Sequence, residues 1–323
     1  MGRCRLGSDL LGYLGPEAWK SGEEIASNLG VSRAAVWKQV QALRSKGYKI
    51  ESSPNKGYRL AKNQDILDPE LIREGLETQF VGNDLRYYRE VKSTNEKARE
   101  MAATCGNGAV VLAEVQTGGR GRLSRSWRSP SGGIWMSLIL KPKMPLAQAY
   151  RINMAVSVAI ARTLIRLYGI RPGIKWPNDI LINERKLCGI LIEVSAEIDC
   201  LEYAVVGIGI NANINVDDFP DDWNATSLSR EIGCQVSRTK LIQALLMEIE
   251  KAYMQMGSPE IYSEWRDRSV TLGRRVRVTS MEGDLEGIAV SLSEDGALEI
   301  ELFEEPGAVK RIVAGDCVHL RAV

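Results

Sequence analysis

The segment from Gln116 to Gly133, QTGGRGRLSRSWRSPSGG, constrains the fold more than any other stretch of the chain. It places five glycines and four arginines within eighteen residues, directly before an apolar run. Glycine loses much conformational entropy when it is fixed, and clustered arginines repel one another. We therefore expect a loop here, and an anion that binds to it would account for both residue types.

Three arginines of this loop, Arg120, Arg122 and Arg125, can hold a phosphate and a carboxylate. Each charge-assisted hydrogen bond contributes about 1.5–3 kcal/mol, whereas ordering the backbone costs at least about 1 kcal/mol per residue. Because these terms nearly cancel, the loop is predicted to be mobile alone and to close over a bound anion. A closed loop would also keep water from a reactive intermediate. The alternative is an ordinary solvated loop.

Strand and helix patterns alternate on both sides of the loop. Strands are expected in LRYYREV, GAVVLAEV, GGIWMSLIL, GIKWP and LEYAVVGIGINAN, with DILINERKLCGILIEVSA as a hairpin that turns near Asn183 and Glu184. Helices are expected in STNEKAREMAA and over Ala147–Tyr168 and Arg238–Met256. Since strands outnumber helices and several are joined by short turns, we predict an α+β fold with a mixed central sheet covered by helices on one side.

Residues 1–64 show a different pattern of two helices and a hairpin. Ser21 and Glu24 form a capping box that begins the first helix, and Gly30 ends it. Ser32 can cap the second helix, whose buried face is marked by the spacing of Val36, Val40 and Leu43. This pattern predicts a winged helix-turn-helix, with residues 32–45 as the recognition helix and a wing around 53–57.

The charge of this first domain favours DNA as its partner. Residues 1–64 carry eleven Lys or Arg against five Asp or Glu, a charge of +6, and since the whole chain carries +1 the remainder carries −5. The candidate DNA-binding residues are Ser32, Arg33, Trp37, Lys38 and Gln41. The alternative is a small helical domain that contacts protein, with its lysines only solvating the surface.

The end of the chain is expected to form a separate small domain. From Arg274 onward, short strands alternate with turn signals such as Glu294-Asp295-Gly296, which predicts an SH3-like small β-barrel. The predicted domains are therefore a winged helix-turn-helix over 1–64, a central α+β domain over 65–270 and an SH3-like domain over 271–323. Whether the last one serves a ligand or is only a structural cap is left open.

Several kinds of chemistry are excluded by what the chain lacks. The only histidine is His319, near the end of an expected strand, which argues against Ser-His-Asp catalysis and multi-histidine metal sites. No P-loop sequence occurs. The six cysteines are scattered without a C-x-x-C pair, as in reduced cytoplasmic proteins, and the longest apolar stretch, Ile152–Tyr168, is too charged to span a membrane. No signal peptide is expected. Chemistry must therefore use Lys, Arg, carboxylates and backbone N–H groups.

Three further stretches carry residue types suited to ligand binding. In KWPND, Pro177 ends a strand and directs Asn178 and Asp179 outward, although a plain turn is equally compatible. In KLCGIL, Lys186 is either a charged residue protecting a sheet edge or a cation that reaches a ligand. In VVGIGINAN, two glycines clear one face of a strand, so that a planar ligand could lie on the backbone.

Taken in order, these stretches resemble the biotin protein ligase family, in its bifunctional form that also acts as biotin operon repressor. The matching segments are STN at Ser93–Asn95, Gln116, GRGR at Gly119–Arg122, Trp127, SP-GG at Ser129–Gly133, KWPND, KLCGIL and GIGIN. The resemblance covers nearly the whole chain. It implies that biotin and ATP form biotinyl-5′-AMP and pyrophosphate, and that a lysine of a biotin carboxyl carrier domain then takes the biotin.

The resemblance also implies roles for individual residues. Biotin is expected to contact Ser93, Thr94, Asn95, Gln116, Arg120, Gly121, Arg122 and Lys186. The nucleotide is expected near Arg120, Arg122, Arg125, Trp127, Asn178, Lys186 and Asn211, of which Asn178 and Asn211 could instead neighbour Mg²⁺. The catalytic candidates are Lys186, Arg120, Arg122 and Asp179, the last orienting the acceptor lysine and helping to deprotonate it.

One residue departs from the family pattern, and two other functions stay open. Ser124 stands where the family commonly has glycine, and a serine there would be strained at positive φ. The first alternative function is a biotin-sensing transcription regulator that has lost ligation; the second is a lipoate or other acyl-group ligase of the same superfold. Operator DNA and a homodimer are further partners implied by the resemblance, and no membrane partner is expected.

Overall fold

The computed structural model describes residues 10–15, 17–45, 47–61, 65–280 and 283–320. The chain divides into two compact units, one formed by residues 1–75 with 237–239 and the other by residues 76–236 with 240–323. This division does not test the domain limits at 64 and 270, which stay predictions.

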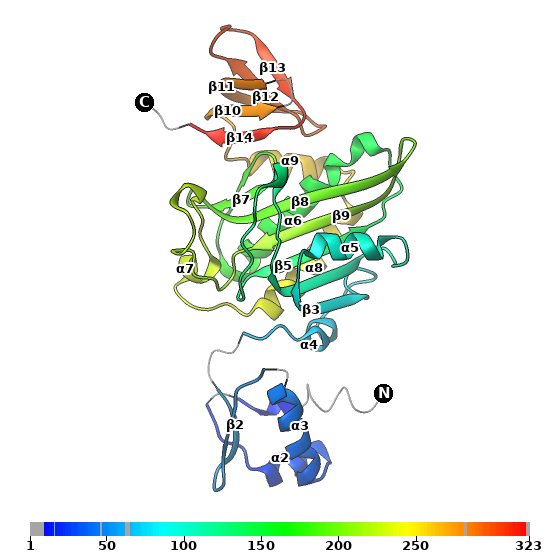
Figure 1. The fold of residues 1–323 in the computed structure, drawn as a ribbon, viewed down its shortest axis with the longest axis vertical. Coiled ribbons are helices and arrows are strands. Elements are labelled where there is room, and N and C mark those ends of the chain that lie inside the picture. The colour runs from blue at the N-terminus through cyan, green and yellow to red at the C-terminus, as the bar shows by residue number, and fades with distance from the viewer. Residues whose placement is uncertain (1–9, 16, 46, 62–64, 281–282, 321–323) are drawn as a thin grey trace. The chain divides into compact units, whose positions relative to one another are not determined.

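The smaller unit contains the two helices and the hairpin expected from its sequence. These are α2 (Gly22–Leu29), α3 (Arg33–Ser45), β1 (Ile50–Ser53) and β2 (Gly57–Leu60), followed by α4 (Pro69–Glu74) (Figure 1). The Ser21 hydroxyl accepts a hydrogen bond from the Glu24 N–H at 3.0 Å, and Gly30 ends α2 at φ 65°. Ser32 accepts from the Ala35 N–H at 3.2 Å. Val36, Val40 and Leu43 are buried in the core of this unit.

The larger unit is built on a seven-stranded sheet in the order β3-β4-β5-β9-β8-β7-β6. Its strands are β3 (Leu85–Val91), β4 (Ala109–Gln116), β5 (Ile134–Leu140), β6 (Gly173–Lys175), β7 (Asp179–Ile182), β8 (Arg185–Glu197) and β9 (Cys200–Ile210). Only β3 and β4 pair in parallel; the other neighbours are antiparallel. The mixed sheet is thus confirmed, and the β7–β8 hairpin turns at Asn183 and Glu184, both at positive φ.

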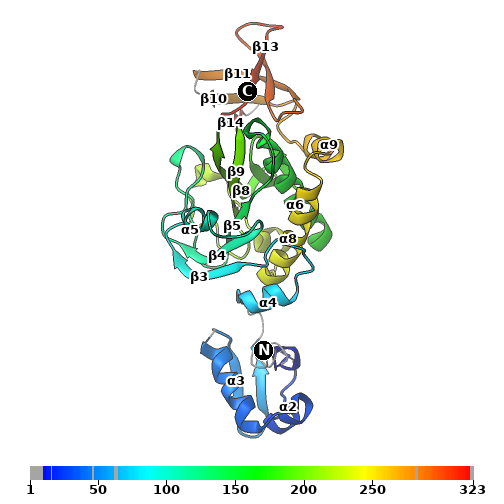
Figure 2. The same cartoon turned by 90° about the vertical axis from the view of Figure 1, so that its right-hand side faces the viewer.

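Helices cover both faces of this sheet, so the prediction of one covered side is wrong. Helix α5 (Thr94–Ala102) lies on one side, while α6 (Tyr150–Tyr168) and α8 (Arg238–Met254) lie on the other (Figure 2). Val111, Ile139 and Val205 pack against α5, whereas the alternate strand residues Leu112, Leu138 and Val206 are fully buried on the opposite face. Strands buried on both faces read as continuous apolar runs, which hides the second helical layer.

The remaining helices of this unit are short. They are α7 (Leu228–Ile232) and α9 (Pro259–Asp267), with 3-10 turns at Arg122–Ser124, Leu146–Gln148 and Asp221–Trp223. No helix among the described residues is long and apolar enough to cross a membrane.

The end of the larger unit is a five-stranded antiparallel sheet in the order β13-β12-β11-β10-β14. Its strands are β10 (Arg275–Ser280), β11 (Gly283–Leu292), β12 (Leu298–Leu302), β13 (Val309–Ile312) and β14 (Asp316–His319). Trp176, which follows β6, links this sheet to the central one. Its indole N–H donates to the Gly296 carbonyl at 2.9 Å, and its backbone N–H donates to Thr271 Oγ1 at 2.9 Å. His319 lies 3.1 Å from the same Thr271 hydroxyl, and burial lowers its pKa to about 4. Its ring is therefore a partly buried contact between Thr271 and the end of β14.

Candidate functional site

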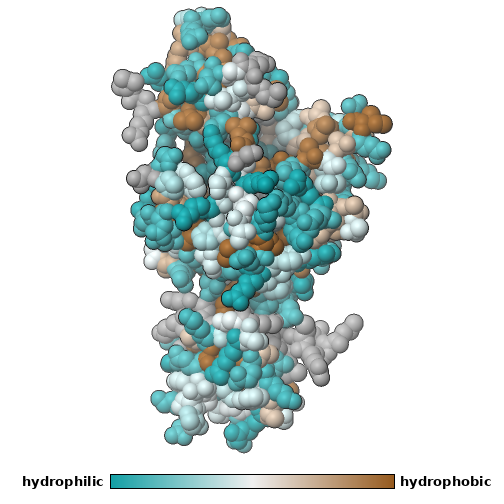
Figure 3. Space-filling view, viewed as in Figure 1, coloured by the Kyte–Doolittle hydropathy of each residue, from teal (hydrophilic) through white to brown (hydrophobic). Residues whose placement is uncertain are grey.

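A cavity of about 720 Å³ opens on the α5 side of the central sheet, within the size range of small-molecule sites. That side of the unit is largely hydrophilic (Figure 3). The cavity is lined by every residue predicted for the ligase site: Ser93, Thr94, Asn95, Gln116, Arg120, Gly121, Arg122, Arg125, Trp127, Asn178, Asp179, Lys186 and Asn211. Residues separated by up to 118 positions are thus brought together; their individual roles stay predictions.

One end of the cavity is a network of hydrogen bonds between α5 and the sheet. Ser137 on β5 donates to Asn95 Oδ1 at 2.6 Å and lies 2.7 Å from the Thr94 hydroxyl. Gln116 Oε1 accepts from the Thr94 N–H at 2.8 Å, and the Gln116 amide donates to Ser129 Oγ at 2.8 Å. Ser137, Thr94, Asn95 and Ser129 are all buried. Buried polar groups satisfied in this way hold their orientation.

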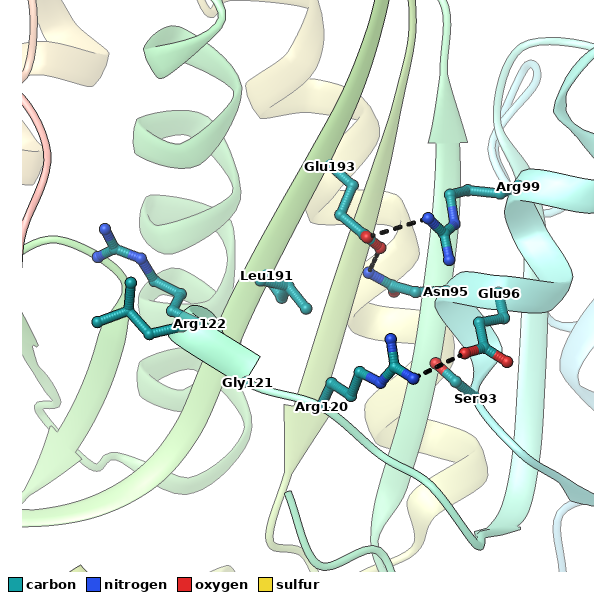
Figure 4. A pocket seen from close by; sticks show the side chains of 10 residues that line it. Ser93, Asn95, Glu96, Arg99, Arg120, Gly121, Arg122, Leu191 and Glu193 are labelled. Atoms are coloured by element: carbon teal, nitrogen blue, oxygen red, sulfur yellow. Dashed lines mark hydrogen bonds and ion pairs between the residues drawn. The ribbon is translucent and has the colours of Figure 1, made fainter. Parts of the chain in front are cut away.

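Glu193 on β8 fixes the direction of this network. Its carboxylate accepts from Asn95 Nδ2 at 2.7 Å and pairs with Arg99 at 3.5 Å (Figure 4). Because a carboxylate only accepts, the Asn95 amide must point its nitrogen toward Glu193 and its oxygen toward Ser137. The Asn95 amide donates one of its two protons to Glu193, so its second proton is left to donate to a ligand. The Ser93 hydroxyl makes no capping bond in α5 and is left for the same purpose.

The glycines of β9 receive side chains of the protein itself. A Cβ on Gly207 would lie 2.3 Å from Asn95 Oδ1, and a Cβ on Gly209 would lie 2.6 Å from the Trp127 indole nitrogen. Trp127 also covers Gly189, which neighbours Gly209 across the β8–β9 pair. The sequence predicted that a planar ligand could lie on the glycine backbone of this strand. In the structure, the indole of Trp127 lies on Gly209 and Gly189.

Trp127 forms part of an aromatic wall at the other side of the cavity. It packs with Phe219 and Ala225 against a cluster that contains Trp135, and Phe219 stacks edge-on with Trp223 at 5.6 Å between ring centroids. The Trp127 indole N–H is buried and has no hydrogen-bond partner among the described residues. Asn211 Oδ1 is likewise buried without a partner, while its amide nitrogen donates to the Thr226 carbonyl at 3.0 Å. Such orphaned groups mark places where a ligand can bond.

Each of the three loop arginines has an acceptor in the structure. Arg120 lies 3.5 Å from Glu96, Arg122 donates to Asn178 Oδ1 at 3.4 Å, and Arg125 pairs with Asp316 on β14 at 2.6 Å. Arg120 and Glu96 are seen in Figure 4. Only the contact of Arg122 is part-buried. Burial lowers the pKa of its guanidinium, and nearby Asp316 and Asp179 oppose that shift. Arg122 is a half-buried cation whose acceptor is a neutral amide at a long distance, so it is suited to bind an anion.

Lys186 lines the cavity, and its place in the sheet bears on one of its two interpretations. Its Nζ lies 2.8 Å from Asp179 Oδ1 and 5.0 Å from the centre of the Trp127 ring system. Both of its backbone polar groups are hydrogen-bonded. The Lys186 N–H donates to the Asn224 carbonyl at 2.7 Å, and the Lys186 carbonyl accepts from the Thr226 N–H at 2.9 Å. The strand carrying it pairs with β7 and β9. Lys186 therefore does not protect a sheet edge.

The strain expected at Ser124 is found one residue earlier. Leu123 has φ 52° and ψ 35°, and its side chain is 67 % exposed, whereas Ser124 is not among the described residues at positive φ. The prediction for Ser124 was wrong because a motif position does not fix which residue of a short turn takes the left-handed conformation.

The described residues contain no group of three or more His, Cys, Asp or Glu that could hold a metal ion. Mg²⁺ commonly binds through one or two protein oxygens together with substrate phosphates. The unpartnered Asn211 oxygen and the Asp179 carboxylate are compatible with such shared binding.

In the smaller unit, the candidate DNA-binding residues lie on the outer face of α3. Ser32, Arg33, Trp37 and Lys38 are exposed, with Trp37 54 % accessible, and Gln41 is half-buried. This face presents cations and one aromatic ring to solvent, opposite the buried Val36 and Val40.

The sequence did not single out several residues that the structure places in or beside the cavity. They are Glu96, Ser137, Glu193, Phe219, Trp223, Asp316 and Cys317, whereas Lys175 belongs to the KWPND stretch but was given no role of its own. The one available signal was a polar residue inside an otherwise apolar strand, as with Ser137 in IWMSLIL.

Comparison with known proteins gives matches along most of the chain. The biotin/lipoate A/B protein ligase family matches residues 87–211, an HTH domain matches 16–59, and the biotin protein ligase C terminal domain matches 271–320. The bifunctional ligase/repressor BirA of Bacillus spizizenii is 41% identical over 303 residues, which cover 92% of both chains. The biotin--[acetyl-CoA-carboxylase] ligase of Mycobacterium tuberculosis is 32% identical over 80% of this chain and 99% of its own.

A solved structure is similar over the larger part of the chain. The biotin protein ligase from Aquifex aeolicus in complex with biotin and ATP aligns with a TM-score of 0.64 and 28% identity, over 74% of this chain and 100% of that one.

Proposed function

Since the chain belongs to the bifunctional ligase/repressor BirA family, we propose that it uses ATP to attach biotin to a lysine of a carrier protein and also represses transcription. The observation that carries the ligase activity is the single cavity that combines a polar network, three loop arginines, Lys186 and an aromatic wall. The observation that carries DNA binding is the cationic outer face of α3.

The polar network is suited to the ureido ring of biotin. Ser93, Thr94, Asn95 and Gln116 offer hydroxyl and amide groups to a ligand. Ser137 and Glu193 set the orientation of Asn95, and Thr94 and Ser129 set that of Gln116. A ureido ring needs both donors and acceptors, and a preoriented network provides them without reorganisation. The carboxylate at the other end of biotin then extends toward Arg120, Gly121, Arg122 and Lys186, which line the same cavity.

In the first step, an oxygen of the biotin carboxylate attacks the α-phosphorus of ATP, the bond to the β-phosphate breaks, and pyrophosphate leaves. Negative charge grows around the α-phosphate as the bond forms. Lys186, Arg122 and Arg120 are placed to stabilise it, with Arg122 and Lys186 partly withdrawn from water. The base is assigned to the wall of Trp127, Phe219 and Trp223, and the Asn211 oxygen supplies an acceptor there.

In the second step, the acceptor lysine attacks the acyl carbon and AMP leaves. Asp179 is the carboxylate nearest to this centre, held 2.8 Å from Lys186. When the phosphate takes over Lys186, Asp179 is free to accept a proton from the incoming ammonium. Mg²⁺ would be bound mainly by the phosphates, with Asn178, Asn211 or Asp179 as protein neighbours, and would neutralise phosphate charge.

Further features of the proposal rest on the resemblance and on composition. The loop around Arg120–Arg125 is expected to close over the labile adenylate, and the five-stranded sheet to form an SH3-like barrel. The acceptor is the carrier domain of a biotin-dependent carboxylase, and the protein acts as a homodimer on operator DNA. A reducing, cytoplasmic setting fits the free state of Cys105, Cys188, Cys200, Cys234 and Cys317.

Both activities can be tested on one pair of variants. Arg33→Ala/Lys38→Ala removes two exposed cations of α3 and should weaken binding to a mixed-sequence DNA duplex by at least about tenfold at low salt, because phosphate contacts are lost. Biotinylation of a recombinant acetyl-CoA carboxylase carrier domain should stay within about twofold of wild type.

The control is Lys251→Ala/Arg266→Ala, which removes the same charge from exposed positions of the larger unit. Equal loss of DNA affinity in the control, or an unchanged affinity in the α3 variant, would argue against α3 as the DNA-binding surface. A wild-type protein that binds biotin and DNA but never labels the carrier domain would instead support the regulator without ligase activity.

A further inference from the structure

The turn between β6 and β7, residues 176–178, brings Asn178 to the wall of the cavity. Strand β8 holds this residue, because the Asn178 amide donates to the Ile190 carbonyl and the Asn178 carbonyl accepts from the Ile190 N–H at 3.0 Å. With its nitrogen directed at Ile190, Asn178 turns its Oδ1 toward Arg122, which donates to it at 3.4 Å. The conformation of the turn therefore decides where Asn178 meets Arg122.

Asn153 on α6 anchors this turn from the face of the sheet opposite the cavity. The half-buried Asn153 donates from Nδ2 to the Pro177 carbonyl at 2.6 Å. Helix α6 covers the face away from α5, whereas the cavity opens on the α5 side (Figure 2). Because a carbonyl only accepts, the Asn153 amide must direct its nitrogen at Pro177. Its Oδ1 is then left buried without a partner among the described residues.

The bond from Asn153 controls the direction of one peptide group in the turn. Among the described residues, no other group donates a hydrogen bond to the Pro177 carbonyl, and a proline has no N–H with which to hold the turn itself. Since a peptide group is planar, the direction of the Pro177 carbonyl also sets that of the Asn178 backbone N–H. Removal of Asn153 leaves a part-buried carbonyl unsatisfied, which is relieved by rotation of this peptide group and displaces Asn178.

The contact with Asn178 holds the guanidinium of Arg122 in the cavity before a ligand arrives. A guanidinium carries five N–H groups, so Arg122 can keep this contact and still donate to a ligand. Arg122 belongs to the glycine-rich loop, in which the neighbouring Leu123 is exposed and lies at positive φ. A loop side chain that is already held in place loses less conformational entropy when it binds a ligand. The position of Asn178 therefore affects how firmly Arg122 retains a ligand.

We propose that Asn153 is a positioning residue for ligand retention, which acts through the 176–178 turn to hold Arg122 in the cavity. This inference rests on the proposed ligase function, in which Arg122 binds the acyl-phosphate end of biotinyl-5′-AMP. Asn153 is not among the residues that line the cavity, so it acts on the ligand only through the turn. It also lies outside the sequence motifs, within the helix that precedes KWPND.

A double-mutant cycle tests this route. Asn153→Ala should raise the dissociation rate of chemically synthesised biotinyl-5′-AMP, measured by stopped-flow displacement, roughly 5- to 30-fold, as for the loss of one buried hydrogen bond. In an Arg122→Ala background, the same substitution should change that rate by less than about twofold, because the residue through which Asn153 acts is gone. Ser157→Ala is the matched control and should leave the rate unchanged. The Ser157 hydroxyl is buried one turn further along α6 and has no partner among the described residues.

Thermal unfolding separates positioning from a general effect on the fold. Asn153→Ala should lower Tm by a similar amount in both backgrounds. An unchanged dissociation rate in Asn153→Ala, or an equal increase with and without Arg122, would overturn the assignment. If Asn153→Ala does not unfold cooperatively, Asn153→Asp carries the same comparison, because an aspartate has the same shape but its carboxylate cannot donate. A wild-type protein that does not bind biotinyl-5′-AMP would instead refute the ligase function, whatever Asn153 does.

Discussion

Replacing Lys186 with alanine is expected to reduce the rate of biotin adenylation by on the order of 10²–10³-fold, as for the removal of a preoriented charge-stabilising donor. The Lys186 ammonium is held by its backbone contacts and by Asp179 in a partly desolvated position. In the proposed mechanism it would therefore meet the charge that develops on the α-phosphate without first having to be ordered. Pyrophosphate release, measured with biotin, ATP and Mg²⁺, gives the rate.

The substitution also leaves the Asp179 carboxylate without its cation, so stability must be measured beside activity. Lys186→Met keeps more of the packing on Trp127 and should lose a comparable amount of activity. Lys143→Ala at an exposed position should have no effect. ATP consumption near the wild-type rate in Lys186→Ala would remove Lys186 from the catalytic centre.

The second large effect is expected for Gly207→Ala on β9. The added Cβ would lie 2.3 Å from Asn95 Oδ1, closer than atoms can approach without movement. Asn95 cannot turn away cheaply, because Ser137 holds its oxygen and Glu193 holds its nitrogen. Breaking this network should raise the dissociation constant for biotin at least about 100-fold and destabilise the fold by about 1–3 kcal/mol.

Titration calorimetry with biotin and thermal unfolding measure the two effects. Gly106→Ala is the matched control, since nothing lies within 4 Å of a Cβ at that exposed glycine. Biotin affinity within a few-fold of wild type in Gly207→Ala would show that the ureido ring is bound elsewhere in the cavity.

Local sequence patterns predicted most elements of the fold. The capping box at Ser21, the glycine at the end of α2 and the apolar spacing in α3 each depend on neighbours within a few residues, and all appear in the structure. The same is true of the β7–β8 turn at Asn183 and Glu184. The pairing of distant strands, which places β9 between β5 and β8, is not encoded by any local pattern. The second helical layer was missed because strands buried on both faces read as continuous apolar runs.

In the site, too, residues within sequence motifs were predicted, whereas residues that act through long-range contacts were not. Residues inside motifs, such as Arg122 and Lys186, line the cavity as the resemblance implied. Glu193 and Ser137 act on Asn95 from strands 98 and 42 residues away, and Asp316 reaches Arg125 from 191 residues away. A lone serine or glutamate in a strand has many ordinary explanations, and only the folded geometry shows that it orients Asn95, a predicted biotin-binding residue.

The most direct test of the proposed function is the formation of biotinyl-5′-AMP without an acceptor. Purified protein is incubated with biotin, ATP and Mg²⁺, separated from free ligands by gel filtration, and the bound fraction is analysed by mass spectrometry. The proposed function predicts close to stoichiometric biotinyl-5′-AMP retained by the protein, with pyrophosphate released in equal amount. Bound biotin with no adenylate and no pyrophosphate would contradict the ligase function and leave a biotin-sensing regulator in its place.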